Sequence, residues 1–186
     1  MNGERAPFFA VSTYKLLCMT IGSLGFYIPF WFYMHWSRIE EREHRSLLPL
    51  LRAIFAIPFV YFLFRRFADA QREHHAGEPL AAGLWAIVLI VLNLLASTLM
   101  MQAGAWPLLG ILLSLLEVVP LLVAQAAINQ HNQLLVPGHD RNDRLTPANR
   151  LVLLIGGVFW LMMAWSLLSG QLPVSSLGQS GFAGLK

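Results

Sequence analysis

The sequence predicts an all-α membrane protein, a polytopic transmembrane helix bundle with four or five spans, and three observations support this fold class. Hydrophobic residues make up 56% of the chain and charged residues only 12%, about half the roughly 25% of soluble domains. The stretch from Pro79 to Leu116 contains no ionisable side chain. Seven of the eleven residues from Phe26 to Trp36 are aromatic, and Trp and Tyr favour membrane interfaces because each ring has an apolar body and a polar tip.

The first predicted span covers residues 14–36. Its uncharged part, Leu16 to Met34, would reach about 28 Å as a helix, close to the ~30 Å thickness of the hydrocarbon core. Because Gly22, Gly25 and Pro29 interrupt this stretch, we expect the first span to be kinked. Four aromatic residues of this span form the predicted membrane-interface motif: Tyr27, Trp31, Tyr33 and Trp36.

The second predicted span, residues 47–64, contains Arg52. The uncharged part that follows Arg52 is too short to cross a bilayer unaided. Three arrangements remain open: the segment crosses while Arg52 extends to the lipid phosphates, it enters the bilayer and returns, or it lies at the interface. A buried ion pair between Arg52 and Glu117 is a further alternative.

The next two spans, residues 80–101 and 107–129, form a tight central hairpin. A single helix over the whole uncharged stretch would overshoot the bilayer about twofold, and Gln102 to Pro107 provides a turn. The last span covers residues 150–168. The Gly- and Ser-rich residues 169–186 are expected to form a flexible tail, which leaves residues 1–168 as a single transmembrane domain.

The distribution of Lys and Arg predicts the orientation. The hairpin turn has neither residue, whereas loops 65–79 and 130–149 carry several Arg, so the positive-inside rule makes these two loops cytoplasmic. Counting Lys and Arg outside the spans and omitting Arg52, five spans place eight basic residues on the cytoplasmic side and four on the other, and four spans place nine and three. We favour five spans, but these counts leave the side of the N-terminus open.

Three polar residues within the predicted spans are the candidates for a functional role: Arg52, Asn93 and Glu117. Glu117 lies roughly 15 Å from the hairpin turn, near the middle of the bilayer. A carboxylate at this depth costs a few kcal/mol and is by default a functional residue. Asn93 lies at the same depth on the other arm of the hairpin. The alternatives are structural pairing of Glu117 with Asn93, a proton or ion path, and contact with a ligand.

The other polar residues suggest little chemistry. Asn129 and Asn132 form a loop motif that either caps a helix end or recognises a lipid or partner. The spacing of His131, His139 and nearby Asp residues fits no standard metal site, and the single cysteine, Cys18, excludes an intrachain disulfide. No catalytic residue, cofactor or metal is therefore expected. Nucleic acid is not expected as a partner either, because no basic stripe lies outside the spans.

Four sequence blocks carry a resemblance to a known family. They are Ser23-Leu24-Gly25-Phe26-Tyr27 with Trp31-Phe32-Tyr33 and Trp36, then Pro49-Leu50-Leu51-Arg52-Ala53-Ile54-Phe55, then Ile128-Asn129-Gln130-His131-Asn132, and finally Gly156-Gly157. In this order they resemble a family of small bacterial membrane proteins of uncharacterised function with the aromatic motif T-x-G-x-Y-x-x-Y-W-F-Y-x-x-W. The resemblance covers roughly residues 8–168 and implies a multi-pass bacterial inner-membrane protein, without an activity to transfer.

Together these features predict a non-catalytic structural or accessory protein of the inner membrane. Its expected partners are the lipid bilayer and either a second copy or another membrane protein, contacted through the aromatic motif and the Arg-rich loops. The alternative is a small transporter or channel with a proton- or ion-linked path through Glu117 and Asn93. An enzyme that acts on lipid is a third alternative, for which no polar cluster can be assembled from the sequence.

Overall fold

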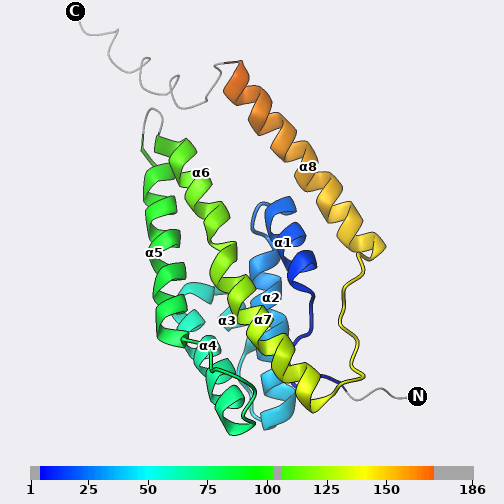
Figure 1. Ribbon diagram of the computed structural model, residues 1–186. Coiled ribbons are helices and arrows are strands. Elements are labelled where there is room, and N and C mark those ends of the chain that lie inside the picture. The colour runs from blue at the N-terminus through cyan, green and yellow to red at the C-terminus, as the bar shows by residue number, and fades with distance from the viewer. Residues whose placement is uncertain (1–4, 103–105, 170–186) are drawn as a thin grey trace, which may run out of the picture.

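The computed structural model describes residues 5–102 and 106–169, and over these residues it contains helices and no strand (Figure 1). The all-α prediction is therefore confirmed. Its elements, in chain order, are α1 (Thr13–Gly22), α2 (Tyr27–Glu43), α3 (Pro49–Ile54), α4 (Ala56–Glu73), α5 (Ala82–Met100), α6 (Trp106–Leu116), α7 (Val118–Leu135) and α8 (Pro147–Leu168).

Three helical stretches within the described residues are long and apolar enough to cross a membrane. They are α5, the combined stretch of α6 and α7 from Leu108 to Leu135, and α8. The chain is thus a membrane protein by the length and composition of these helices. The segments 14–36 and 47–64, predicted as the first two spans, are not among them.

The segment 14–36 is divided between two helices. α1 ends at Gly22 and α2 begins at Tyr27. Between them Leu24 and Gly25 have positive φ angles of 53° and 87°, and the Ser23 hydroxyl accepts a hydrogen bond from the Tyr27 N–H at 2.9 Å. This turn reverses the chain, so residues 14–36 form a helical pair and not one continuous helix. The interruption falls where the glycines were expected to weaken the helix.

The segment 47–64 is divided in the same way. α3 ends at Ile54, and Phe55, with φ −97° and ψ 47°, separates it from α4. Pro58 in the first turn of α4 has no N–H to continue the hydrogen bonds of α3. The second half of α4 is charged and amphipathic, so this helix is not a uniformly apolar span.

The central hairpin consists of α5 and α6, which lie side by side (Figure 1). Gly110 makes the close approach possible, since a Cβ atom there would lie 2.8 Å from the Ala96 carbonyl oxygen. Residues 103–105 of the predicted turn lie outside the described residues. Glu117 separates α6 from α7 because Pro120 cannot donate a hydrogen bond to the Leu116 carbonyl.

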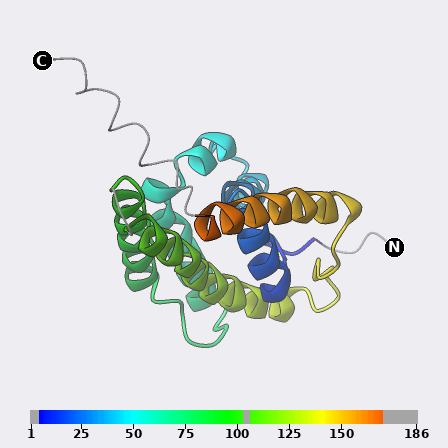
Figure 2. The ribbon, with the colours of Figure 1, turned by 90° about the horizontal axis from the view of Figure 1, so that it is seen from above.

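α8 contacts the rest of the molecule over a small area. Thr146 and Asn149 form a capping box at its start, as the Thr-Pro pair in the sequence favours. A Cβ atom at Gly156 would come within 1.7 Å of the Gly22 carbonyl oxygen, and Trp160 Nε1 donates to the Ile21 carbonyl at 2.9 Å. Figure 2 shows α8 crossing α1 at this contact. The predicted tail begins at the end of α8, and residues 170–186 lie outside the described residues.

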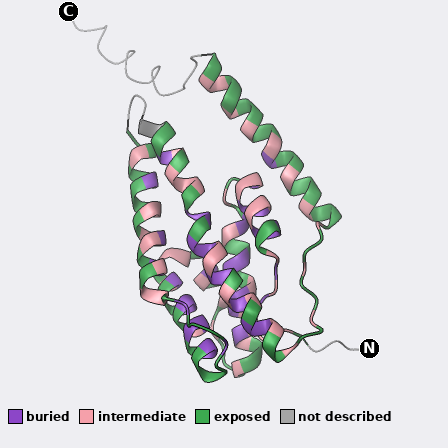
Figure 3. Ribbon diagram, viewed as in Figure 1, coloured by how far each residue is buried: buried purple, intermediate pink, exposed green. Residues whose placement is uncertain are grey.

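The core lies where α2, α4 and α7 meet the N-terminal segment, whereas α8 is mostly exposed and buries only Gly156 (Figure 3). Trp31, Phe32 and Trp36 are fully buried and Tyr27 is nearly so, while Tyr33 is exposed. Three of the four residues of the predicted interface motif thus lie in the protein core and not among lipid headgroups. At about 100° per residue, Tyr27, Trp31 and Trp36 spread over about half of the circumference of α2, and this half also contains the other buried residues of the helix. Tyr33 falls on the other half.

Candidate functional site

Three amide side chains on one face of α7 hold the N-terminal segment. Asn132 binds Phe8 twice, donating to its carbonyl at 3.1 Å and accepting from its N–H at 3.2 Å. Asn129 donates to the Val11 carbonyl at 2.9 Å. The structure shows neither the predicted loop position nor a helix-end cap for Asn129 and Asn132: both lie within α7 and bind backbone of the N-terminal segment. Gln125 completes the set, and its spacing of four and seven residues from the two asparagines was a signal that the sequence analysis missed.

Gln125 is the centre of a buried polar cluster. Its Oε1 accepts a hydrogen bond from Trp31 Nε1 at 2.6 Å and lies 3.1 Å from His35 Nε2. Its Nε2 donates to the Phe9 carbonyl at 3.1 Å and to Asn129 Oδ1 at 2.8 Å. Every polar atom of this amide is therefore paired, which fits a structural role for Gln125 in joining α2, α7 and the N-terminal segment.

The C-terminal ends of α2, α4 and α7 meet at one end of the molecule, beside Phe8. The Arg42 guanidinium carbon lies 4.6 Å from the Phe8 ring centroid, and the His74 and His131 rings are 5.3 Å apart. Burial lowers the pKa of Arg42 from its ordinary value, while Glu43 and Glu73 oppose that shift. No group of three His, Cys, Asp or Glu side chains within the described ranges could hold a metal ion.

We call this end of the molecule the basic end, because it gathers the loops and helix ends that carry most of the Lys and Arg. Lys15 Nζ donates to Asn142 Oδ1 and to the Arg144 carbonyl, both at 2.8 Å, which places the start of α1 against the loop before α8. The loop after α4 and the loop after α7 lie at this end (Figure 1). Only Lys186 follows α8 in the sequence, and the other basic residues precede it or lie in its first turn.

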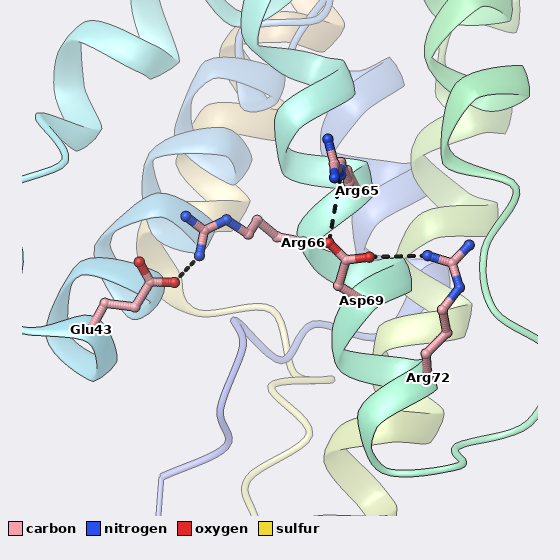
Figure 4. A network of polar contacts seen from close by, with 5 residues as sticks. All are labelled: Glu43, Arg65, Arg66, Asp69 and Arg72. Atoms are coloured by element: carbon pink, nitrogen blue, oxygen red, sulfur yellow. Dashed lines mark hydrogen bonds and ion pairs between the residues drawn. The ribbon is translucent and has the colours of Figure 1, made fainter.

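On the side of α4, three arginines form ion pairs with two carboxylates (Figure 4). Asp69 pairs with Arg65 at 3.7 Å and with Arg72 at 3.0 Å, all on α4. Arg66 pairs with Glu43 and thereby joins α4 to the end of α2. The Asp69 pairs are exposed and contribute little to stability, while the pair of Arg66 with Glu43 is partly shielded.

Arg52 lies on α3 against two aromatic rings. Its guanidinium carbon is 4.2 Å from the Trp36 ring centroid and 5.4 Å from that of Phe59. No hydrogen bond or ion pair joins the Arg52 guanidinium to another residue in the described part of the chain, so the alternative of a buried pair with Glu117 is not observed. The neighbouring apolar side chains of α3 are exposed: Leu48, Leu50, Leu51, Ile54 and Phe55.

Asn93 and Glu117 contact each other, as their equal distance from the hairpin turn suggested. Asn93 Nδ2 donates to Glu117 Oε2 at 3.2 Å, and the Glu117 side chain is only 7% exposed. The contact joins α5 to the break between α6 and α7. Both residues of this contact were thus predicted from the sequence, because a hairpin places residues that are equally far from its turn at the same depth in the bilayer.

Asn93 and Glu117 also line a cavity of about 550 Å³ between the α1–α2 turn, α5, α6 and α8. Most of its lining is apolar and includes Phe32, Leu89 and Trp160. Thr20 lines the same cavity. It is only 5% exposed, and its hydroxyl has no hydrogen-bond partner. Volume and lining are those of small-molecule sites, which are largely apolar with a few polar groups.

Comparison of this chain with protein-family models, with curated proteins and with solved structures finds no match. The resemblance to a family of small bacterial membrane proteins therefore stays a prediction. Three features of the structure could carry a function: the basic end, Arg52 with the exposed apolar side chains around it, and the cavity beside Glu117.

Proposed function

We propose that this chain is a non-catalytic protein of the cytoplasmic membrane that binds anionic lipid through its basic end. The observation that carries this proposal is the distribution of charge: the stretch 79–116, which contains the hairpin turn, has no Lys or Arg, whereas the ends of α2 and α4 and the loop after α7 carry Arg42, Arg45, Arg72, Arg141 and Arg144. Each basic residue near an anionic leaflet contributes about 1 kcal/mol of attraction. The positive-inside rule then assigns the basic end to the cytoplasm, with the stretches 65–79 and 130–149, which were predicted as loops and include the end of α4, the end of α7 and the start of α8.

This distribution is best explained if only α5, the stretch from α6 to α7, and α8 cross the bilayer. α1 has 10 residues and would reach about 15 Å, half the hydrocarbon thickness. α2 then returns to the basic end. α4 behaves similarly, because Ala56 and Ile57 at its start line the cavity beside Asn93 while its last residues lie near His131. In this topology both predicted early spans enter one leaflet and return, and the N-terminus is cytoplasmic.

Cysteine accessibility tests this topology. In a Cys18→Ser background, the single-cysteine variants Ala6→Cys, Arg45→Cys and Glu78→Cys would be treated with a membrane-impermeant maleimide in vesicles of both orientations. We expect all three sites to react from the cytoplasmic side. Reaction of Arg45→Cys from the opposite side would instead indicate five spans, and reaction of Ala6→Cys alone from that side would indicate four.

Arg52 is the basic residue best placed to bind a lipid phosphate. Its guanidinium has aromatic rings on its faces and no carboxylate partner among the described residues, and the apolar side chains around it are exposed as in an interfacial helix. Trp36 and Phe59 orient the guanidinium by cation–π contact. A phosphate would provide the charge-assisted hydrogen bonds that this group otherwise lacks.

Native mass spectrometry tests lipid binding by the detergent-solubilised protein. We expect it to retain phosphatidylglycerol in preference to phosphatidylcholine, and Arg52→Gln to reduce this retention. Arg72→Gln is the matched control, because Arg72 already has a carboxylate partner in Asp69. Equal retention of both lipids would contradict the proposal, and an equal effect of both substitutions would contradict the particular role of Arg52.

Proton or ion conduction is a second candidate, favoured by the contact between Asn93 and Glu117 at membrane depth. Along α7, however, the fully buried Leu121 and Ala124 separate Glu117 from the polar cluster around Gln125. A continuous polar path would require these helices to rearrange. Glu117→Gln in proteoliposomes with an internal pH dye tests this candidate: a path through the carboxylate predicts loss of the flux, and Glu78→Gln provides the control.

A further inference from the structure

We propose that the cavity beside Glu117 binds an amine that carries an apolar tail. The ammonium group would contact the Glu117 carboxylate and the tail would lie against the apolar lining. This site is separate from the basic end and does not depend on the lipid binding proposed above.

Of two buried polar groups that line this cavity, one lacks a hydrogen-bond partner and the other lacks a counter-charge among the residues that the structure describes. Asn93 gives Glu117 a hydrogen bond, but no ion pair in the described residues joins Glu117 to a basic side chain. The Thr20 hydroxyl is nearly buried and has no partner. Buried polar groups are normally hydrogen-bonded, and both of these line the same space of about 550 Å³. A ligand that donates hydrogen bonds would satisfy them together.

The positive charge of the ligand follows from the chemistry of the lining. An ammonium can donate charge-assisted hydrogen bonds to a carboxylate and a further bond to a hydroxyl. A fatty acid or a neutral alcohol could only exchange a hydrogen bond with Glu117, whereas an amine can also take up the carboxyl proton and form an ion pair. A hydrated inorganic cation fits poorly as well, because the surrounding Phe32, Leu89 and Trp160 offer almost no oxygen ligands to replace its water.

The apolar tail follows from the position of the cavity. Leu24 and Phe26, both in its lining, are 39% and 81% exposed, so the space opens towards the apolar surroundings of the helices. A hydrocarbon chain could extend past these side chains into lipid without burying polar groups. An amine without such a tail would lose this contribution and bind more weakly.

Three probes with the same twelve-carbon tail test the proposal: dodecylamine, dodecanol and dodecanoate. They would be added to the full chain in detergent, and binding followed by thermal unfolding. A second measurement follows the labelling of Glu117 by dicyclohexylcarbodiimide, which reacts with carboxyl groups in apolar surroundings, through peptide mass spectrometry. We expect dodecylamine to raise the unfolding midpoint and to protect Glu117, and the two other probes to do neither.

Variants locate the effect. Glu117→Gln should weaken dodecylamine binding by roughly tenfold or more, since it removes the charged acceptor, and Thr20→Val by roughly threefold to tenfold. Glu78 is an exposed carboxylate outside the cavity, so Glu78→Gln should leave dodecylamine binding unchanged. Ser97→Phe keeps Glu117 but fills part of the cavity, and it should also abolish binding.

Equal effects of dodecylamine and dodecanol would overturn the proposal, since binding would then depend on the tail alone. Unchanged amine binding in a folded Glu117→Gln protein would overturn it as well. If that variant does not fold, the wild-type labelling experiment decides: labelling of Glu117 at the same rate with and without dodecylamine excludes an amine at this carboxylate. None of these outcomes depends on whether the basic end binds anionic lipid.

Discussion

Two tryptophans show how the two regions of this molecule differ. Trp31 lies in the core formed by α2, α4, α7 and the N-terminal segment. It is fully buried, and its ring N–H donates to Gln125. Trp165 on α8 is 72% exposed, and most of the other large apolar residues of that helix are exposed too. The first region folds around its own side chains, whereas the second is a set of apolar helices with little protein against them.

The difference reflects what solvates each region. Lipid solvates apolar side chains as well as a protein core does, so α8 needs no hydrophobic core to be stable in a bilayer. Buried polar groups find no such replacement in lipid, and Gln125, Asn129 and Asn132 are accordingly paired within the protein. Stability at the basic end should therefore depend on individual side chains, and stability of α8 on a few backbone contacts.

The largest expected effect tests this comparison directly. Trp31→Ala should lower the free energy of unfolding by about 3–5 kcal/mol, because it removes a fully buried ring and leaves a cavity. Trp165→Ala should change it by less than about 1 kcal/mol, since lipid or detergent replaces the lost contacts. Both are measured by denaturant titration in one detergent. Similar losses for the two variants would show that α8 is covered by protein in solution.

Removal of the central amide should have the next largest effect. Gln125→Leu leaves the N–H of Trp31 and the carbonyl of Phe9 without their partner inside the core, at a cost of about 2–4 kcal/mol. The exposed Gln130→Leu on the same helix is the control and should be nearly neutral. Protease sensitivity around Phe9 should rise only in Gln125→Leu. An unchanged cleavage pattern would argue against the amide as the anchor of the N-terminal segment.

The attachment of α8 is tested by two adjacent glycines. Gly156→Ala places a Cβ atom against the Gly22 carbonyl, and we expect a loss of about 1–3 kcal/mol as α8 shifts or detaches. Gly157→Ala meets nothing within 4 Å and should be neutral or slightly stabilising, because Ala favours helix. Hydrogen exchange at Gly22 to Gly25 should increase only in the first variant. The same exchange in both would mean that the glycine contact does not hold α8.

The smallest effects concern the exposed ion pairs. Arg72→Gln should change the free energy of unfolding by less than about 0.5 kcal/mol, because its pair with Asp69 is solvated. Arg66→Gln should cost more, about 1 kcal/mol, since Arg66 joins α4 to Glu43 on α2 in a partly shielded pair. Thermal unfolding at low and high salt compares them. A larger loss for Arg72→Gln would indicate that Arg72 has a role beyond its pair with Asp69.

Composition and the long uncharged stretch were sufficient to predict an all-helical membrane protein and the central hairpin. The depth of Glu117 and its partner Asn93 followed from counting residues on either side of the turn. These features are local, because apolar length and helical rise act along the chain and need no knowledge of what packs nearby.

The folded chain alone decided which aromatic residues face protein and which apolar segments form helices long enough to cross a membrane. An aromatic residue suits a lipid interface and a protein core equally, so residues 26–36 carried no sign that Trp31 and Trp36 would be buried. Segments 14–36 and 47–64 are apolar enough to suggest spans, but the turn at Leu24 and Gly25 and the break at Phe55 divide them. The roles of Gln125 and Gly156 were likewise hidden, because each depends on a partner about 90 or more residues away.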